Sequence, residues 1–137
     1  MRRLLIVLGV AGMLSGCSNP AILNAQQVPP ENVVAAGVTK PTPGDYPVSF
    51  VRDTLPGHAY GLGVYVDGKR VADIHGGETL TIYVAPGHHH FGVGPHVQGA
   101  APSIEVGAKV SSDDHPVFRI TIVAWGWGGW DMKQIDD

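Results

Sequence analysis

Residues 62–94, which read LGVYVDGKRVADIHGGETLTIYVAPGHHHFGVG, decide the fold of this 137-residue chain. Within and beyond this stretch, apolar side chains recur at every second position, the spacing that places them on one face of a β-strand. The alternating positions are Leu62, Val64 and Val66, then Leu80, Ile82 and Val84, and later Phe118, Ile120 and Ile122. Each run predicts a half-buried strand, and together they indicate an all-β protein.

Turn signals separate these runs. Asp67-Gly68, Gly76-Gly77 and Pro86-Gly87 each offer a residue that tolerates positive φ or has a preset φ where the chain must reverse. The expected strands begin near residues 62, 70, 79 and 88, a spacing that is typical of a small meander of hairpins. We therefore expect one small antiparallel β-sandwich over residues 48–130, followed by a solvated tail at residues 131–137.

The hairpin expected at Pro86-Gly87 has a definite register. It would pair Ile82 with Phe91 and Leu80 with Val93. Because this pairing gathers the apolar side chains of both strands on one face, the pattern supports it.

The register of the Asp67-Gly68 hairpin stays open. A two-residue loop would pair Val64 with Val71, whereas a one-residue bulge would instead turn Ile74 inward. Both arrangements are compatible with the apolar pattern.

The overall composition excludes several classes of protein. The chain holds 19 glycines and 11 prolines, and because both residues interrupt helices, a helix bundle is disfavoured. The single cysteine cannot form an internal disulfide. A net charge of −3 provides no basic surface for nucleic acid, so we expect no nucleic-acid partner.

The N-terminus has the form of an export signal. Arg2 and Arg3 precede an apolar run at residues 4–14. A membrane-spanning helix needs about 20 apolar residues, so this run is too short to cross a bilayer core. Its charge and length are those of a secretory signal peptide.

The signal ends in Leu14-Ser15-Gly16-Cys17, which resembles the lipobox of bacterial lipoproteins. The resemblance implies that residues 1–16 are removed as a lipoprotein signal peptide and that Cys17 carries the acyl chains that anchor the protein in a membrane. It also implies, from Ser18, the outer membrane in preference to the inner membrane, with the domain facing the periplasm. Apart from this covalent lipid, we expect no cofactor.

Removal of the signal changes the charge of the chain. It takes away Arg2 and Arg3 and no acidic residue, which leaves 7 basic and 12 acidic residues and a net charge of −5 in the mature chain. Anionic lipid repels such a chain. We therefore expect the lipid on Cys17 alone to hold the protein at the membrane.

Residues 17–47 are rich in Pro, Asn and Gln and show no sustained periodicity. We interpret them as the lipidated N-terminus and a flexible linker, whose root-mean-square reach would be about 30 Å. The alternative is that part of this segment packs on the domain, either as a short helix at residues 21–27 or as a strand at Val33-Val34.

A second resemblance lies in the domain. A strand at residues 64–66, an Asp-Gly-Lys turn, a second strand and the Pro-Gly-x-His turn at residues 86–88 occur in this order. The arrangement is similar to PEGA-type domains and related small lipoprotein domains, which are small β-sandwiches. The resemblance implies a surface-associated binding or structural module and supplies no catalytic residue.

Three adjacent histidines, His88-His89-His90, are a candidate metal site. On a strand, His88 and His90 would project from the same face about 6.6 Å apart, from which two imidazoles can converge on zinc. His89 would point inward with Phe91. A third ligand could come from one of four residues, namely His75, His96, Asp73 or Glu78. The alternative is a solvated strand in which a histidine pairs with Tyr83.

Three tryptophans near the C-terminus are a candidate partner surface. If the last strand continues, Trp125 and Trp127 lie on the face opposite Phe118, where exposed rings would suit a sugar or a protein surface. The alternative is that these rings belong to the core, because a small domain has reason to bury its large aromatic side chains.

Motifs for catalysis are absent from the sequence. It contains no Gly-x-Ser-x-Gly elbow and no Walker-type phosphate loop, and Cys17 is consumed by lipid. We therefore expect a lipid-anchored envelope protein that acts without catalysis, through binding an unidentified envelope protein or glycan or through a structural role. The alternative function is a metal-binding envelope lipoprotein that uses His88 and His90.

Overall fold

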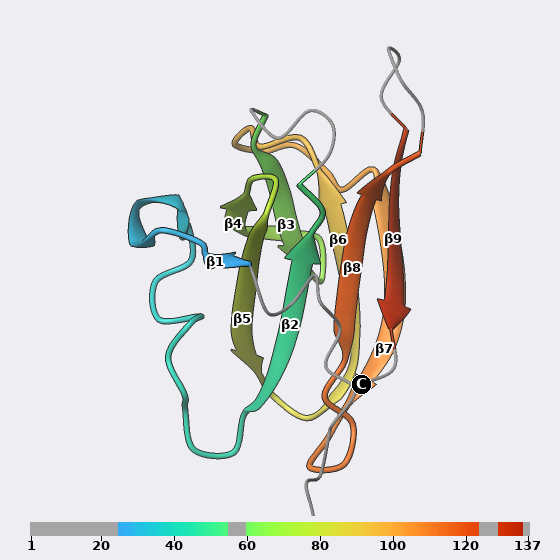
Figure 1. Ribbon diagram of the computed structural model, residues 1–137. Helices are drawn as coiled ribbons and strands as arrows, with labels where there is room; N and C mark the ends of the chain where they lie inside the picture. Colours follow the sequence, from blue (N-terminus) through green and yellow to red (C-terminus); the bar gives the residue numbers. More distant parts are fainter. Residues whose placement is uncertain (1–24, 55–59, 124–128, 136–137) are drawn as a thin grey trace, which may run out of the picture.

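The computed structural model describes residues 25–54, 60–123 and 129–135, which form two packed β-sheets (Figure 1). One sheet has the strand order β1-β5-β2-β8-β9, and the other has the order β4-β3-β6-β7. The elements are β1 (Gln26–Gln27), the 3-10 helix η1 (Pro30–Asn32), β2 (Tyr46–Arg52), β3 (Leu62–Val66), β4 (Lys69–Ile74), β5 (Glu78–Val84), β6 (Gly87–Gly94), β7 (Ile104–Val110), β8 (Val117–Ile122) and β9 (Trp130–Ile135). The expected all-β sandwich is confirmed, with antiparallel pairs throughout except for β1–β5 and β2–β8.

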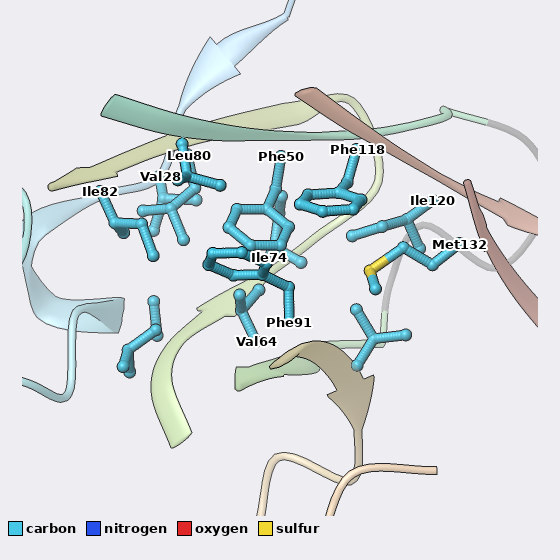
Figure 2. Packing of buried hydrophobic residues seen from close by; sticks show 14 of the residues in the cluster. Val28, Phe50, Val64, Ile74, Leu80, Ile82, Phe91, Phe118, Ile120 and Met132 are labelled. Carbon is cyan, nitrogen blue, oxygen red and sulfur yellow. The ribbon is translucent and has the colours of Figure 1, made fainter. Parts of the chain in front are cut away.

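The core lies between the two sheets and is built around three aromatic rings (Figure 2). Phe50 of β2, Phe91 of β6 and Phe118 of β8 are fully buried. The ring centroid of Phe91 lies 5.2 Å from that of Phe118 and 6.1 Å from that of Phe50. Because β6 belongs to the opposite sheet from β2 and β8, these ring contacts join the two sheets directly.

The connection at Pro86-Gly87 is not a hairpin. β5 pairs with β2, whereas β6 pairs with β3 and β7, so the chain crosses from one sheet to the other after Val84. The predicted pairing of Ile82 with Phe91 is therefore wrong. β5 and β6 direct their apolar side chains into the same core from opposite sheets. Two neighbouring strands of one sheet would show the same alternating sequence pattern, so the pattern does not distinguish the two arrangements.

The Asp67-Gly68 turn does close a hairpin, between β3 and β4. Asp67 and Gly68 have φ values of 50° and 79°, as a type I′ turn requires at its two central positions. The register shifts between Val64 and Tyr65, so that Leu62 pairs with Ile74. Ile74 is fully buried, and the bulged alternative is thus the one that the protein adopts.

The sandwich extends beyond the predicted bounds on its N-terminal side. The amide of Val28, just after β1, donates to the carbonyl of Thr79 in β5 at 2.9 Å. The amides of Val34 and Ala35 donate to the carbonyl of Val71 in β4 at 2.9 and 3.0 Å. This segment, which we call the strap (residues 26–39), therefore bonds to both sheets on one side of the sandwich (Figure 1).

The strap corrects the expectation of a flexible linker for residues 26–39. The alternative in which Val33-Val34 packs on the domain agrees with the structure, because Val33 forms an isolated bridge with Ala72 of β4. Val28 is 8% exposed and belongs to the hydrophobic core. The helix considered at residues 21–27 falls partly outside the described residues, and within it Gln26–Gln27 are a strand.

The sandwich also extends beyond its predicted C-terminal bound. Trp130–Ile135 form β9, which pairs antiparallel with β8. The expected solvated tail is therefore wrong for residues 131–135. Met132 is 3% exposed and packs in the core. The polar Asp131, Lys133 and Gln134 hid the strand, because they leave only a short apolar alternation.

The outer face of the second sheet is covered by its own loop. Tyr65 of β3 is fully buried although it faces away from the core, and its hydroxyl donates to the carbonyl of Pro95 at 2.5 Å. A Cβ on Gly63 would lie 2.7 Å from that carbonyl oxygen, and a Cβ on Gly94 would lie 2.8 Å from the amide nitrogen of Ser103. Glycine at these positions lets residues 95–103 pack flat against the sheet.

Within the described ranges, no helix is long and apolar enough to cross a membrane.

Candidate functional site

His88 and His90 lie on the exposed outer face of β6. In the register of β6 with β7, His88 is paired with Lys109 and His90 with Gly107. The His90 ring lies 3.9 Å from the position that a Cβ on Gly107 would take. The ammonium of Lys109 forms an ion pair with Asp114 at 3.6 Å. Among the described residues, no group of three or more His, Cys, Asp or Glu side chains is placed to hold a metal ion.

The alternative prediction, a solvated strand in which a histidine pairs with Tyr83, agrees with the structure only in part. The pairing of a histidine with Tyr83 does not occur, because β5 and β6 lie in different sheets. His89 does turn toward Phe91, and the two ring centroids are 6.0 Å apart.

His89 is the member of the cluster with defined polar partners. Its Nδ1 lies 2.7 Å from Oδ2 of Asp67, and its Nε2 lies 2.7 Å from the carbonyl oxygen of Ala85. Both partners are hydrogen-bond acceptors. A neutral imidazole has one N–H, so the geometry favours the doubly protonated imidazolium, which donates to both. The second carboxylate oxygen of Asp67 accepts the amide of His90 at 2.9 Å.

This geometry shifts the pKa values of both groups. Burial of the ring lowers the pKa of His89, but the hydrogen bonds to Asp67 and to the Ala85 carbonyl outweigh it, so the pKa is raised overall. Burial would raise the pKa of Asp67, while the hydrogen bonds from His89 and from the His90 amide lower it, and the net pKa lies below the usual value. The pair therefore favours its ionised form on both sides.

The four candidate third ligands do not lie beside His88 and His90. His75 follows β4, His96 follows β6, and both stand at the far end of the second sheet, next to Gly61. Glu78 accompanies His75, with its Oε2 3.5 Å from Nδ1 of His75. Asp73 forms an ion pair with Arg70 at 3.8 Å. The structure thus places the candidate third ligands His75 and His96 away from His88 and His90.

Of the three tryptophans, the structure describes Trp130. Its ring lies under the guanidinium of Arg52, whose Cζ is 4.5 Å from the ring centroid. Arg52 is 2% exposed, and its Nη1 donates to the carbonyls of Ile74 and Tyr60 at 2.7 and 2.5 Å. Burial lowers the pKa of Arg52, and the charge of Glu78 opposes that effect. Sequence reasoning missed this buried arginine, because Arg52 ends a run that alternates only weakly.

Two predicted sites lie outside the described residues. They are the lipid attachment site Cys17 and the candidate partner surface at Trp125 and Trp127. Both sites stay predictions.

The two sides of the sandwich differ in how their edges are covered. On one side the strap bonds to β5 and β4. On the other side β9 ends the five-stranded sheet (Figure 1). The amide of Val123 donates to the carbonyl of Gly129, which continues the register of the β8–β9 pair. Because hydrogen-bonded pairs recur at every second position, the odd-numbered residues of β9 bond to β8. The backbone groups of Met132 and Gln134 therefore point away from β8, and β9 lies next to β7 of the other sheet.

The sequence was compared with protein-family models and with curated proteins, and the structure was compared with solved structures; none of the three comparisons found a match.

Proposed function

We propose that this protein is a lipid-anchored component of a bacterial cell envelope and that its β-sandwich binds a partner without catalysis. The proposal places the anchor at Cys17, in the outer membrane, with the sandwich facing the periplasm. The observation that supports the anchor best is the sequence Leu14-Ser15-Gly16-Cys17, and the first described strand begins at Gln26, nine positions after Cys17.

The nine positions between Cys17 and Gln26 limit how far the sandwich can lie from the membrane. Nine residues span at most about 30 Å when fully extended. The strap thus shortens the reach that a linker to residue 47 would have had. In this proposal, the anchor holds the sandwich near the membrane and does not let it search widely.

The strap also orients the sandwich. It is attached beside β4 and β5, so the anchored side is the one whose edges are already covered. The β9 edge lies on the other side of the five-stranded sheet, next to β7 (Figure 1). A strand added there by an envelope protein would pair with the outward backbone groups of Met132 and Gln134. Asp131 and Lys133, whose side chains form an ion pair at 3.1 Å, place charges on this edge strand, as is common for edge strands.

The anchor is tested with Cys17→Ala. The wild-type protein is expected to enter the detergent phase on partitioning and to label with palmitate in cells, and the variant is expected to do neither. Equal detergent partitioning of the two proteins would contradict the anchor.

The partner edge is tested with a photo-crosslinking residue placed at Gln134, in whole cells, and with a matched probe at Lys40 beside the strap. A protein adduct is expected from Gln134 and none from Lys40. Gln134→Pro removes one outward N–H and should weaken the interaction with the captured protein, while Gln134→Ala keeps the N–H and the interaction. Adducts with glycan alone, or equal adducts from both positions, would count against a protein strand at this edge.

A metal-binding lipoprotein that uses His88 and His90 was the second candidate. The structure gives these two side chains no described third ligand and places Lys109 beside them.

A further inference from the structure

Two histidines flank a glycine at one end of the second sheet. The registers Leu62–Ile74 and Gly63–Gly94 continue outward, so that Gly61 falls between His75, which follows β4, and His96, which follows β6. Side chains at these three positions share the outer face of the sheet, because successive residues alternate between faces. Gly61 has no side chain, so the rings of His75 and His96 can lie close to its backbone.

Both imidazoles lie close to Gly61. A Cβ on Gly61 would lie 3.2 Å from Nε2 of His75 and 3.6 Å from Cγ of His96. These two ring atoms are therefore less than 7 Å apart, since each lies within 3.6 Å of the same point. Two imidazole nitrogens that bind one metal ion at about 2.0–2.1 Å each lie within about 4 Å of each other, so metal binding would turn the two rings toward each other.

Glu78 fixes the orientation of His75. Its Oε2 accepts the backbone amide of His75 at 2.7 Å and lies 3.5 Å from Nδ1 of the same residue. A shortening of the 3.5 Å contact to a hydrogen bond from Nδ1 would leave Nε2 as the ligand nitrogen, which is the usual support for a metal-binding histidine. His75 thus presents Nε2 toward Gly61, and Glu78 supports it from behind.

We propose that His75 and His96 bind a divalent late transition-metal ion, such as Cu²⁺ or Zn²⁺, over Gly61. Imidazole nitrogens suit both metals, and the Irving–Williams order places Cu²⁺ above Zn²⁺ in affinity. Water completes the coordination, because His96 is exposed. This site is distinct from His88 and His90, which lie toward the other end of β6, and it does not depend on the proposed partner edge.

The first test is a calorimetric titration of the purified full chain with CuCl₂ and with ZnCl₂ in metal-free buffer. One ion per chain is expected, with Cu²⁺ bound more tightly. His75→Gln and His96→Gln should each weaken binding by at least about tenfold, and Glu78→Gln by about tenfold through loss of ligand orientation. Melting temperatures measured without metal show whether each variant folds, so that lost binding is not mistaken for lost structure.

Gly61→Ala gives an independent test that keeps every ligand. The new Cβ would approach Nε2 of His75 to 3.2 Å and displace the ring, so metal affinity should fall while the fold is retained. The double variant His88→Gln with His90→Gln is the matched control and should bind metal as the wild-type protein does. Zn²⁺ should shift the imidazole NMR signals of His75 and His96 in the wild-type protein.

The proposal is overturned if the folded wild-type protein binds neither metal at micromolar concentration. It is also overturned if the control variant loses binding while His75→Gln and His96→Gln keep it.

Discussion

The carboxylate of Asp67 and the imidazole of His89 lie 2.7 Å apart and join the β3–β4 turn to β6. The other ring nitrogen of His89 bonds to Ala85, in the connection that carries the chain from one sheet to the other. One side chain therefore ties together a turn, a strand and the crossing between the sheets.

The ion pair of Asp67 with His89 is expected to stabilise the folded protein only within a limited range of pH. The pKa of His89 is raised, so its contribution is complete below the unfolded pKa of about 6.5 and is lost as the pH rises through the folded pKa. The pKa of Asp67 is lowered, so its contribution is present above the unfolded pKa of about 3.9 and is lost as the pH falls through the folded pKa. The pair stabilises most at mildly acidic pH.

His89→Gln measures this window. Because the Asp67 side chain is 51% exposed and solvent screens the pair, we expect the variant to lose only about 1 kcal/mol at pH 5 to 6. The difference in melting temperature between wild type and variant should shrink from pH 6 to pH 9. A difference that stays constant or grows over this range would show that the imidazolium is not the stabilising species.

Gly63→Ala should destabilise the sandwich by about 1–3 kcal/mol, because the new Cβ would meet the Pro95 carbonyl oxygen at 2.7 Å and the Tyr65 ring at 2.8 Å. Gly107→Ala is the matched control in a strand of the same sheet, where the nearest atoms lie 3.9 Å away, and it should be close to neutral. Urea unfolding of the two variants measures the contrast. Equal effects would mean that residues 95–103 do not pack against Gly63.

Arg52→Met should cost about 2–4 kcal/mol, because the carbonyls of Ile74 and Tyr60 lose a charged donor at a buried site. Arg52→Lys should recover only part of this loss, since an ammonium cannot reproduce the planar fork or its stacking on Trp130. Thermal unfolding compares the three proteins. Full recovery by lysine would show that charge alone matters at this position.

The strap should be visible in amide hydrogen exchange. The amides of Val28 and Val34 donate to strand carbonyls, so we expect them to exchange far more slowly than in an unfolded chain. Val34 makes the sharper case, because its side chain is 49% exposed and burial alone would not protect its amide. Exchange of both amides at the rate of an unfolded chain would support the interpretation of this segment as a flexible linker.

The strands were largely predictable from sequence, and their partners were not. The alternation at Leu80, Ile82 and Val84 places these residues on an inner face, and that face is the same whether β6 is a neighbour or lies across the core. Both arrangements bury Phe91, so the apolar pattern could not choose between them. β9 was missed for the opposite reason, since its edge position tolerates polar residues that break the alternation.

The candidate sites show the same division. Adjacency in the chain drew attention to His88 and His90, which the fold leaves on an exposed face beside Lys109. His75 and His96 are 21 positions apart, and only the pairing of β3 with both β4 and β6 brings them to Gly61. No local signal in the sequence could have joined them.

The sequence by itself determined the properties that depend on near neighbours: the period of the strands and the left-handed turn at Asp67-Gly68. The tertiary structure alone decided which sheet each strand joins, that the strap closes one side of the sandwich, and which histidines meet. The physical reason is that burial rewards any arrangement with apolar side chains inside. The choice among such arrangements depends on contacts between segments that are distant in the chain, such as the ring of Phe91 against Phe50 and Phe118.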